Sequence, residues 1–131
     1  MQIESAKEIV LPDLSYKIIG AAFEVFNELG WGLPEKDYQI ALSKELKELG
    51  FNVKREVYIP LKYKTSNISR YFADFVVDDK ILLEIKVVSR LGYFHARQIL
   101  TYLRTANLRL GILLYFTQEG VKYRRVLNSH Y

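Results

Sequence analysis

The 131-residue sequence contains no cysteine. This absence excludes a disulfide framework, a thiolate zinc site and a cysteine nucleophile, and it fits a reducing compartment. Long hydrophobic runs are also missing, because the longest apolar stretches, residues 81–83 and 110–116, have only the length of strands. The first eight residues lack the basic segment and apolar core of a signal peptide. We therefore expect a soluble, cytoplasmic protein with no membrane partner.

Glycine and proline are scarce, with seven and three residues, and no stretch rich in them could serve as a linker. The length fits one domain that buries a substantial core, and half of the residues are apolar. We predict an N-terminal lead over residues 1–14 and a single domain over residues 15–131, present as a monomer or a homodimer.

Acidic residues are scarce in the last third of the chain, although the net charge is only +4. From residue 90 onward Glu119 is the one acidic residue, whereas the basic residues are Arg90, Arg97, Arg104, Arg109, Lys122, Arg124 and Arg125. Such an excess is what a surface that contacts phosphate needs, and Arg90, Arg97 and Arg104 are our candidates for nucleic-acid contacts. A solvated basic surface without a partner explains the same pattern equally well.

Hydrophobic periodicity and the positions of glycine and proline predict eight main elements. We expect helices near residues 15–29, 34–49 and 93–105, and strands near 51–59, 71–77, 81–88, 110–116 and 121–127. Pro60 should limit the first strand, and residues 61–63 either extend it or pair beside it. This order predicts an α/β fold with a mixed central β-sheet flanked by helices.

The strand expected over residues 81–88 carries charge in an apolar setting. One face alternates Ile, Leu, Ile and Val, and the other has apolar ends around Glu84 and Lys86. A strand that is apolar on both faces is usually covered on both faces, so these two charges should be partly buried. Buried charges are costly unless they are paired or bind a metal.

Asp74 interrupts the neighbouring apolar strand, and the hairpin register decides whether it meets Glu84. A two-residue loop would pair Asp74 with Leu83 and place Glu84 on the opposite face. A loop of residues 78–80 pairs Asp74 with Glu84 on one face, with Cβ atoms roughly 5 Å apart. Two carboxylates that close repel unless a cation lies between them, and Mg²⁺ suits oxygen ligands. The alternative is a structural ion pair between Lys86 and either carboxylate.

The helices add further candidates. Glu35 shares a helical face with Tyr38 and Leu42, although it could simply sit favourably at a helix N-terminus. Gln98 and Tyr102 lie one helical turn apart, with His95 on the same face, and could contact phosphate or hold a lysine. They could equally be ordinary helix residues.

Three blocks of the sequence resemble the GxxExxY family of small prokaryotic proteins, which is placed in the PD-(D/E)XK nuclease superfamily. They are Gly32-x-x-Glu35-x-x-Tyr38, Ala73-Asp74 followed by Glu84-Ile85-Lys86, and His95-x-x-Gln98 with Tyr102. The last block is also similar to the Q-x-x-x-Y helix of RecB-type nucleases. The resemblance covers nearly the whole chain and implies a restriction-endonuclease-like core.

The resemblance also implies roles for these residues. Asp74, Glu84 and the backbone carbonyl of Ile85 would bind Mg²⁺ or Mn²⁺, and Glu35 would complete the metal shell directly or through water. Lys86 would assist the attacking water, while Gln98 and Tyr102 would position Lys86 or the scissile strand.

The expected function is metal-dependent hydrolysis of phosphodiester bonds by in-line attack of an activated water, on DNA rather than RNA. The alternative is a catalytically silent nucleic-acid-binding or protein-interaction module on the same fold.

Overall fold

The computed structural model describes residues 10–89, 94–129 and 131. The elements follow the predicted order: α1 (Pro12–Leu29), α2 (Glu35–Glu48), β1 (Val53–Tyr63), β2 (Ser66–Val77), β3 (Ile81–Val87), α3 (Phe94–Ala106), β4 (Leu110–Thr117) and β5 (Gly120–Leu127). Within the described ranges, no helix is long and apolar enough to cross a membrane.

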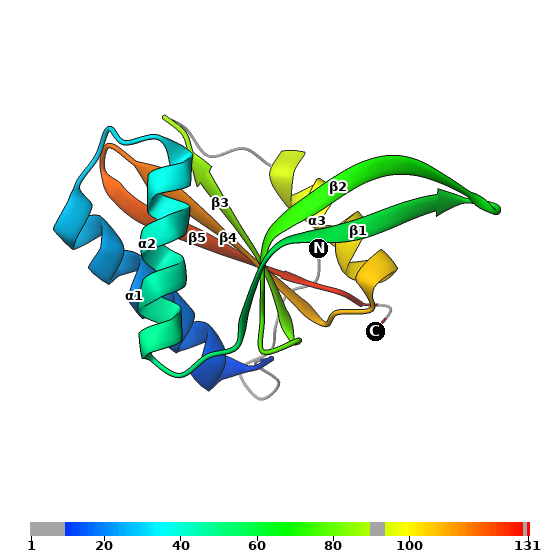
Figure 1. Ribbon diagram of the computed structural model, residues 1–131, viewed down its shortest axis with the longest axis horizontal. Helices are drawn as coiled ribbons and strands as arrows, with labels where there is room; N and C mark the ends of the chain where they lie inside the picture. The colour runs from blue at the N-terminus through cyan, green and yellow to red at the C-terminus, as the bar shows by residue number, and fades with distance from the viewer. Residues whose placement is uncertain (1–9, 90–93, 130) are drawn as a thin grey trace.

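The five strands form one sheet in the order β1-β2-β3-β4-β5 (Figure 1). β3 and β4 are parallel and are connected through α3, whereas all other neighbours are antiparallel. One hydrophobic cluster joins α1 and α2 to one sheet face, and a second joins α3 to the other face. The predicted α/β class, with a mixed sheet flanked by helices, is therefore confirmed.

The N-terminal boundary differs from the prediction. Proline 12 starts α1 instead of ending a lead, because the first helical turn needs no N–H donor from that residue. Val10, just before the helix, is already buried in the core. The lead is therefore shorter than 14 residues, and positions 1–9 lie outside the described residues.

β1 and β2 are longer than predicted and form an extended antiparallel ribbon (Figure 1). Pro60 lies inside β1, opposite Arg70, and does not end the strand. The physical reason is that β1 is an edge strand, where a proline can leave its missing N–H on the unpaired side. Residues 61–63 therefore extend β1 rather than pairing beside it.

The β2–β3 hairpin adopts the register with the three-residue loop, residues 78–80. Phe75 pairs with Leu83, Val76 with Leu82, and Val77 with Ile81. Extended by one position, the same register places Asp74 level with Glu84, where the ladder has ended and side-chain hydrogen bonds link the two strands instead.

The β1–β2 ribbon reverses its faces at Asp74. Ala73 packs in the α3 cluster, whereas Phe75, two residues later, packs in the α1–α2 cluster. In a regular strand both would share one face. Glu56 lies opposite Asp74 in this register and has a positive φ of 51°. These two residues are not register partners, whereas their neighbours on either side are. The irregularity therefore separates the sheet body from an outer ribbon segment and leaves Asp74 at the junction.

Candidate active site

Glu84 and Lys86 lie near the C-terminal end of β3, on the face that α3 covers. Leu82 and Val88, at the same alternate spacing, both belong to the α3 cluster. Glu84 is only 4% exposed, and Lys86 is half-buried. The expectation that an apolar setting buries these charges is therefore met most fully by Glu84.

Asp74 and Glu84 are joined by reciprocal hydrogen bonds at the point where the β2–β3 ladder stops. The Asp74 backbone N–H donates to Glu84 Oε1 over 3.2 Å, and the Ile85 N–H donates to Asp74 Oδ2 over 2.8 Å. Each carboxylate thus replaces a backbone carbonyl of the interrupted ladder. In the hydrogen bonds among described residues, Asp74 Oδ1 and Glu84 Oε2 take no part.

Tyr71 is a member of the site that the sequence interpretation missed. Its hydroxyl donates to Glu84 Oε1, and its ring stacks on Tyr102 with centroids 3.5 Å apart and planes 10° from parallel. Tyr102 is buried, and its link to Glu84 is this stacking on the ring of Tyr71. Tyr71 lies three residues before Asp74, and in a regular strand two such residues would point to opposite faces. The reversal of the strand faces at Asp74 is what brings the Tyr71 hydroxyl to Glu84.

The charge state of Glu84 is strongly perturbed. Burial and, to a smaller extent, the nearby Asp74 carboxylate raise its pKa to about 8, against opposing effects of the Tyr71 hydrogen bond, the Lys86 ammonium and the Asp74 backbone N–H. Burial and the negative charge of Glu84 also raise the pKa of the Tyr71 hydroxyl, which therefore stays protonated and acts as a donor. The two carboxylates repel each other, and a cation between them would offset this repulsion.

Glu35 approaches this pair from the N-terminus of α2. Burial raises the pKa of its carboxyl, Lys86 lowers it, and Asp74 raises it, so both charges lie within electrostatic reach; a backbone hydrogen bond from Val87 lowers it as well. Glu35 therefore lies within electrostatic reach of Asp74 and Lys86, and its place in a metal shell stays a prediction.

Tyr38 explains how the Gly32-x-x-Glu35-x-x-Tyr38 spacing places Glu35. The buried Tyr38 hydroxyl donates to the Gly30 carbonyl over 2.5 Å and accepts from the Leu33 N–H over 3.3 Å. Its ring packs edge-on against Phe116 of β4. Tyr38 thereby anchors the α1–α2 loop, in which Gly32 has a φ of 106° that favours glycine, and this fixes the start of α2.

α3 brings Tyr102 and His95 to the site but not Gln98. Burial lowers the pKa of His95, and the positive charge of Lys86 lowers it as well, so His95 lies near Lys86. Gln98 is exposed, and among the described residues it forms no hydrogen bond to the carboxylates. Gln98 lies about 100° around the helix from Ile99, which is at the centre of the buried face, so the role implied for it toward Lys86 or the scissile strand stays a prediction.

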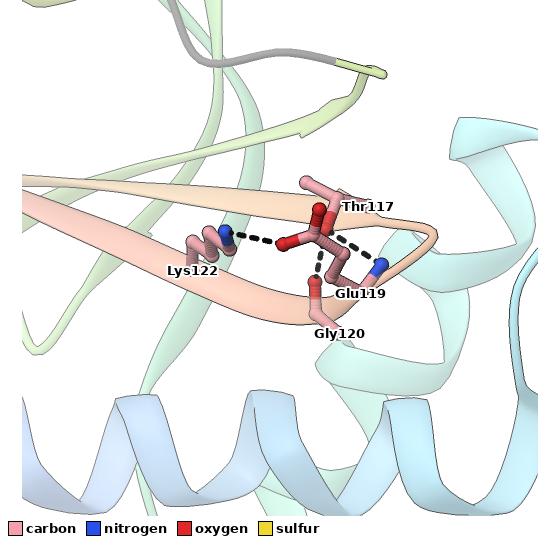
Figure 2. A network of polar contacts seen from close by, with 4 residues as sticks. All are labelled: Thr117, Glu119, Gly120 and Lys122. Carbon is pink, nitrogen blue, oxygen red and sulfur yellow. Dashed lines mark hydrogen bonds and ion pairs between the residues drawn. The ribbon is translucent and has the colours of Figure 1, made fainter.

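The basic residues of the C-terminal third are only partly available to a partner. Arg97 and Arg104 are exposed on α3, whereas Arg90 lies outside the described residues. Lys122 forms an ion pair with Glu119 at the β4–β5 turn, where the Thr117 hydroxyl bonds the Gly120 carbonyl and accepts from the Glu119 N–H (Figure 2). Arg125 donates to the Val10 carbonyl and so helps to hold the N-terminal segment on β5.

Comparison with known proteins agrees with this geometry. The family model of the PD-(D/E)XK nuclease superfamily matches residues 12–126, which is most of the chain. The chain belongs to the PD-(D/E)XK nuclease superfamily. No curated protein matches it in sequence.

Among solved structures, the crystal structure of SSO0001 is similar, with a TM-score of 0.57 and 22% identity. The match covers 70% of this chain and 48% of the chain of that neighbour. The present chain therefore spans about half the length of that neighbour. At this identity the likeness shows the shared fold alone.

Superfamily membership suggests nuclease activity, a nucleic-acid substrate and a divalent metal. The donor set fits such an ion, because Asp74, Glu84 and Glu35 supply the oxygen ligands that hard divalent cations prefer. Within the described ranges, however, no three acidic or histidine side chains are already grouped closely enough to hold a metal. Asp74 and Glu84 are adjacent, and Glu35 would have to move toward them.

Proposed function

We propose that the chain is a Mg²⁺- or Mn²⁺-dependent nuclease that hydrolyses phosphodiester bonds in DNA. The observation that carries this proposal is the convergence of Glu35, Asp74 and Glu84 with Lys86 at one end of β3. Asp74 and Glu84 are adjacent, Glu35 lies within electrostatic reach of Asp74, and burial raises the pKa of both Glu35 and Glu84. A bound cation would offset the cost of this buried charge.

In this proposal Asp74, Glu84 and the Ile85 backbone carbonyl hold the metal, and Glu35 completes its shell directly or through water. The ion, when bound, supplies Lewis acidity and lowers the pKa of a bound water. The unengaged Asp74 Oδ1 and Glu84 Oε2 are the natural ligand atoms, since the opposite oxygens are fixed by Tyr71 and the backbone.

Lys86 offsets charge that develops on the phosphate and helps to orient or deprotonate the attacking water. Its position between Glu35 and His95 supports this role, because both of these groups sense its charge. Tyr102 acts as a positioning residue through its stacking on Tyr71. For Gln98 the exposed position supports contact with the substrate strand better than contact with Lys86.

Arg97 and Arg104 support a nucleic-acid partner, because they are exposed and lie two turns apart on α3, the helix that also carries Tyr102. Arg90 stays a candidate from sequence. The anchoring role of Tyr38 supports placement in the GxxExxY family within the superfamily.

The decisive experiment is a cleavage assay on single- and double-stranded DNA and RNA with Mg²⁺, Mn²⁺ or EDTA. We expect metal-dependent cleavage, which Lys86→Ala and Glu84→Ala reduce at least a hundredfold. Lys86→Ala should leave binding largely intact, since Lys86 acts mainly in the transition state. Lys80→Ala, at the exposed hairpin tip of the same strand, is the matched control and should cleave normally. Wild-type activity in Lys86→Ala would refute the assignment.

One observation favours the catalytically silent alternative. The hydrogen bonds of Asp74 and Glu84 to backbone amides and Tyr71 already give both carboxylates a structural role. A purified wild-type protein that binds nucleic acid but cleaves none of these substrates would establish that alternative.

A further inference from the structure

The outer part of the β1–β2 ribbon, residues 57–73, projects from the sheet body (Figure 1). We refer to this segment as the arm. It begins next to Asp74, where the ribbon reverses its faces, so the arm is attached directly at the candidate active site.

One side of the arm packs on α3, and the other exposes aromatic rings. Ile59 and Ala73 are buried in the α3 cluster, and Tyr71 packs against it. On the opposite side Tyr58 and Phe72 are register partners with ring centroids 5.3 Å apart. They are 43% and 48% exposed. Two exposed rings in contact with each other form a small apolar patch, and such patches are typical of surfaces that contact a partner.

The arm is also strongly basic. Residues 57–73 contain Lys62, Lys64 and Arg70 and no acidic residue. Arg70 shares the exposed side with Phe72, two residues away along β2. All three cations are exposed, and over the described ranges none forms an ion pair. This positive charge, which no ion pair in the described ranges offsets, would attract an anionic partner.

A shallow cavity of about 320 Å³ adjoins Tyr58 at the base of the arm. Apolar side chains form much of its lining, including Val57, Ile59 and Leu108, and the ion pair between Lys54 and Asp79 lies at the same cavity.

We propose that the arm binds single-stranded nucleic acid, an inference that rests on the proposed nuclease function for its biological purpose. Unpaired bases stack on Tyr58 and Phe72, while Arg70, Lys62 and Lys64 contact the phosphates. Because the arm joins the sheet at Asp74, a strand held on its Tyr58–Phe72 side reaches this junction from the side opposite Glu84 and Tyr71. The surface thus favours a single-stranded substrate or a frayed end.

The observations favour this occupant over two others. A duplex keeps its bases stacked on one another, so it would gain nothing from two exposed aromatic faces. A second copy of the chain would bring the same three unpaired cations against these cations, which is repulsive.

The test measures the affinity of fluorescent single-stranded oligonucleotides in EDTA, so that cleavage cannot interfere. Tyr58→Ala with Phe72→Ala should weaken binding at least tenfold, whereas Tyr58→Phe with Phe72→Tyr should bind like the wild type. The matched control is Tyr16→Ala on α1, which is 80% exposed and far along the chain from the arm. Duplex of the same sequence should bind more weakly than the single strand.

The charge contribution is measured separately from the salt dependence. Lys62→Gln with Arg70→Gln should reduce the slope of log affinity against log salt by about 0.7 for each cation. Lys17→Gln with Lys44→Gln, at exposed positions on α1 and α2, should leave the slope unchanged. All variants are first checked for wild-type melting temperature.

Unchanged single-strand affinity in the aromatic double variant would overturn the proposal. Tighter binding of duplex than of single strand would also overturn it. The same holds if the aromatic double variant converts a dimer into a monomer while its oligonucleotide affinity stays unchanged. The two proposals can fail separately. If the wild type cleaves while the arm variants bind normally, only the proposal about the arm is refuted. If binding depends on the arm but no cleavage occurs, only the proposal of nuclease activity is refuted.

Discussion

At the scale of single residues, Glu84 is a carboxylate held in a buried position by its neighbours. Tyr71 and the Asp74 backbone donate to one oxygen, and Lys86 supplies a positive charge nearby. These interactions do not outweigh burial and the repulsion by Asp74, so the protonated form of Glu84 is favoured in the metal-free fold.

This balance predicts how metal-free stability depends on pH. The pKa of Glu84 rises from an unfolded value near 4.5 to about 8 on folding. The folded state then binds a proton that the unfolded state releases, so stability falls as the pH rises. The contribution of Glu84 to stability is fully present below about pH 4.5 and is lost as the pH rises through about 8. Melting temperature in EDTA should therefore decrease from pH 5 to pH 8.5.

Glu84→Gln should flatten this decrease, because glutamine stays neutral across the range. Glu48→Gln, at an exposed position at the end of α2, provides the control and should melt with the wild-type pH profile. An unaltered profile in Glu84→Gln would show that the repulsion around Glu84 is not what limits stability.

At the scale of elements, α3 reaches the site because it packs closely on β4 at Gly111. A Cβ atom at that position would lie 2.7 Å from Ile99 Cγ2 and 3.2 Å from Leu103 Cδ1. Ile99 is β-branched and stiff, so it cannot turn away cheaply. Gly111 therefore sets how near α3, and with it Tyr102, approaches the sheet.

Gly111→Ala should destabilise the fold by about 1–3 kcal/mol, as overpacking in a core does. The change is measured as the free energy of unfolding in urea. Gly20→Ala is the matched control, because a Cβ atom there meets nothing within 4 Å and the position lies in the interior of α1. It should instead stabilise by about 0.5–1 kcal/mol. Equal effects of the two substitutions would contradict close packing of α3 on β4.

At the scale of the whole molecule, the candidate site exists only where four elements meet. α2 brings Glu35, β2 brings Asp74 and Tyr71, β3 brings Glu84 and Lys86, and α3 brings Tyr102. A metal that binds these ligands binds the folded state alone, so it should stabilise the entire domain by mass action.

Melting temperature should therefore rise with Mg²⁺ or Mn²⁺ and return to its starting value with EDTA. The gain corresponds to about 2.7 kcal/mol when the free metal reaches a hundred times its dissociation constant. Asp74→Asn should blunt the response. Asp79→Asn, which removes only an exposed charge paired with Lys54, should respond like the wild type. A wild type whose melting temperature ignores metal would contradict the proposed ligand set.

Local sequence determined much of the fold and the centre of the site. Alternation of apolar residues around Glu84 and Lys86 predicted a covered strand, and the hairpin length brought Asp74 opposite Glu84. Helical periodicity places Glu35 on the same face as the buried Tyr38, and its pKa responds to Asp74 and Lys86 as that placement predicts. These features depend on spacing within one element or one hairpin, which sequence shows directly.

Tertiary structure decided the rest. Pro60 is tolerated because β1 lies at the sheet edge, and Tyr71 reaches Glu84 because the ribbon reverses its faces at Asp74. Gln98 is exposed because the docking of α3 on β4 selects which arc of the helix is buried. Strand order, ribbon distortion and helix rotation arise from packing between segments far apart in the chain, so no local pattern could determine them.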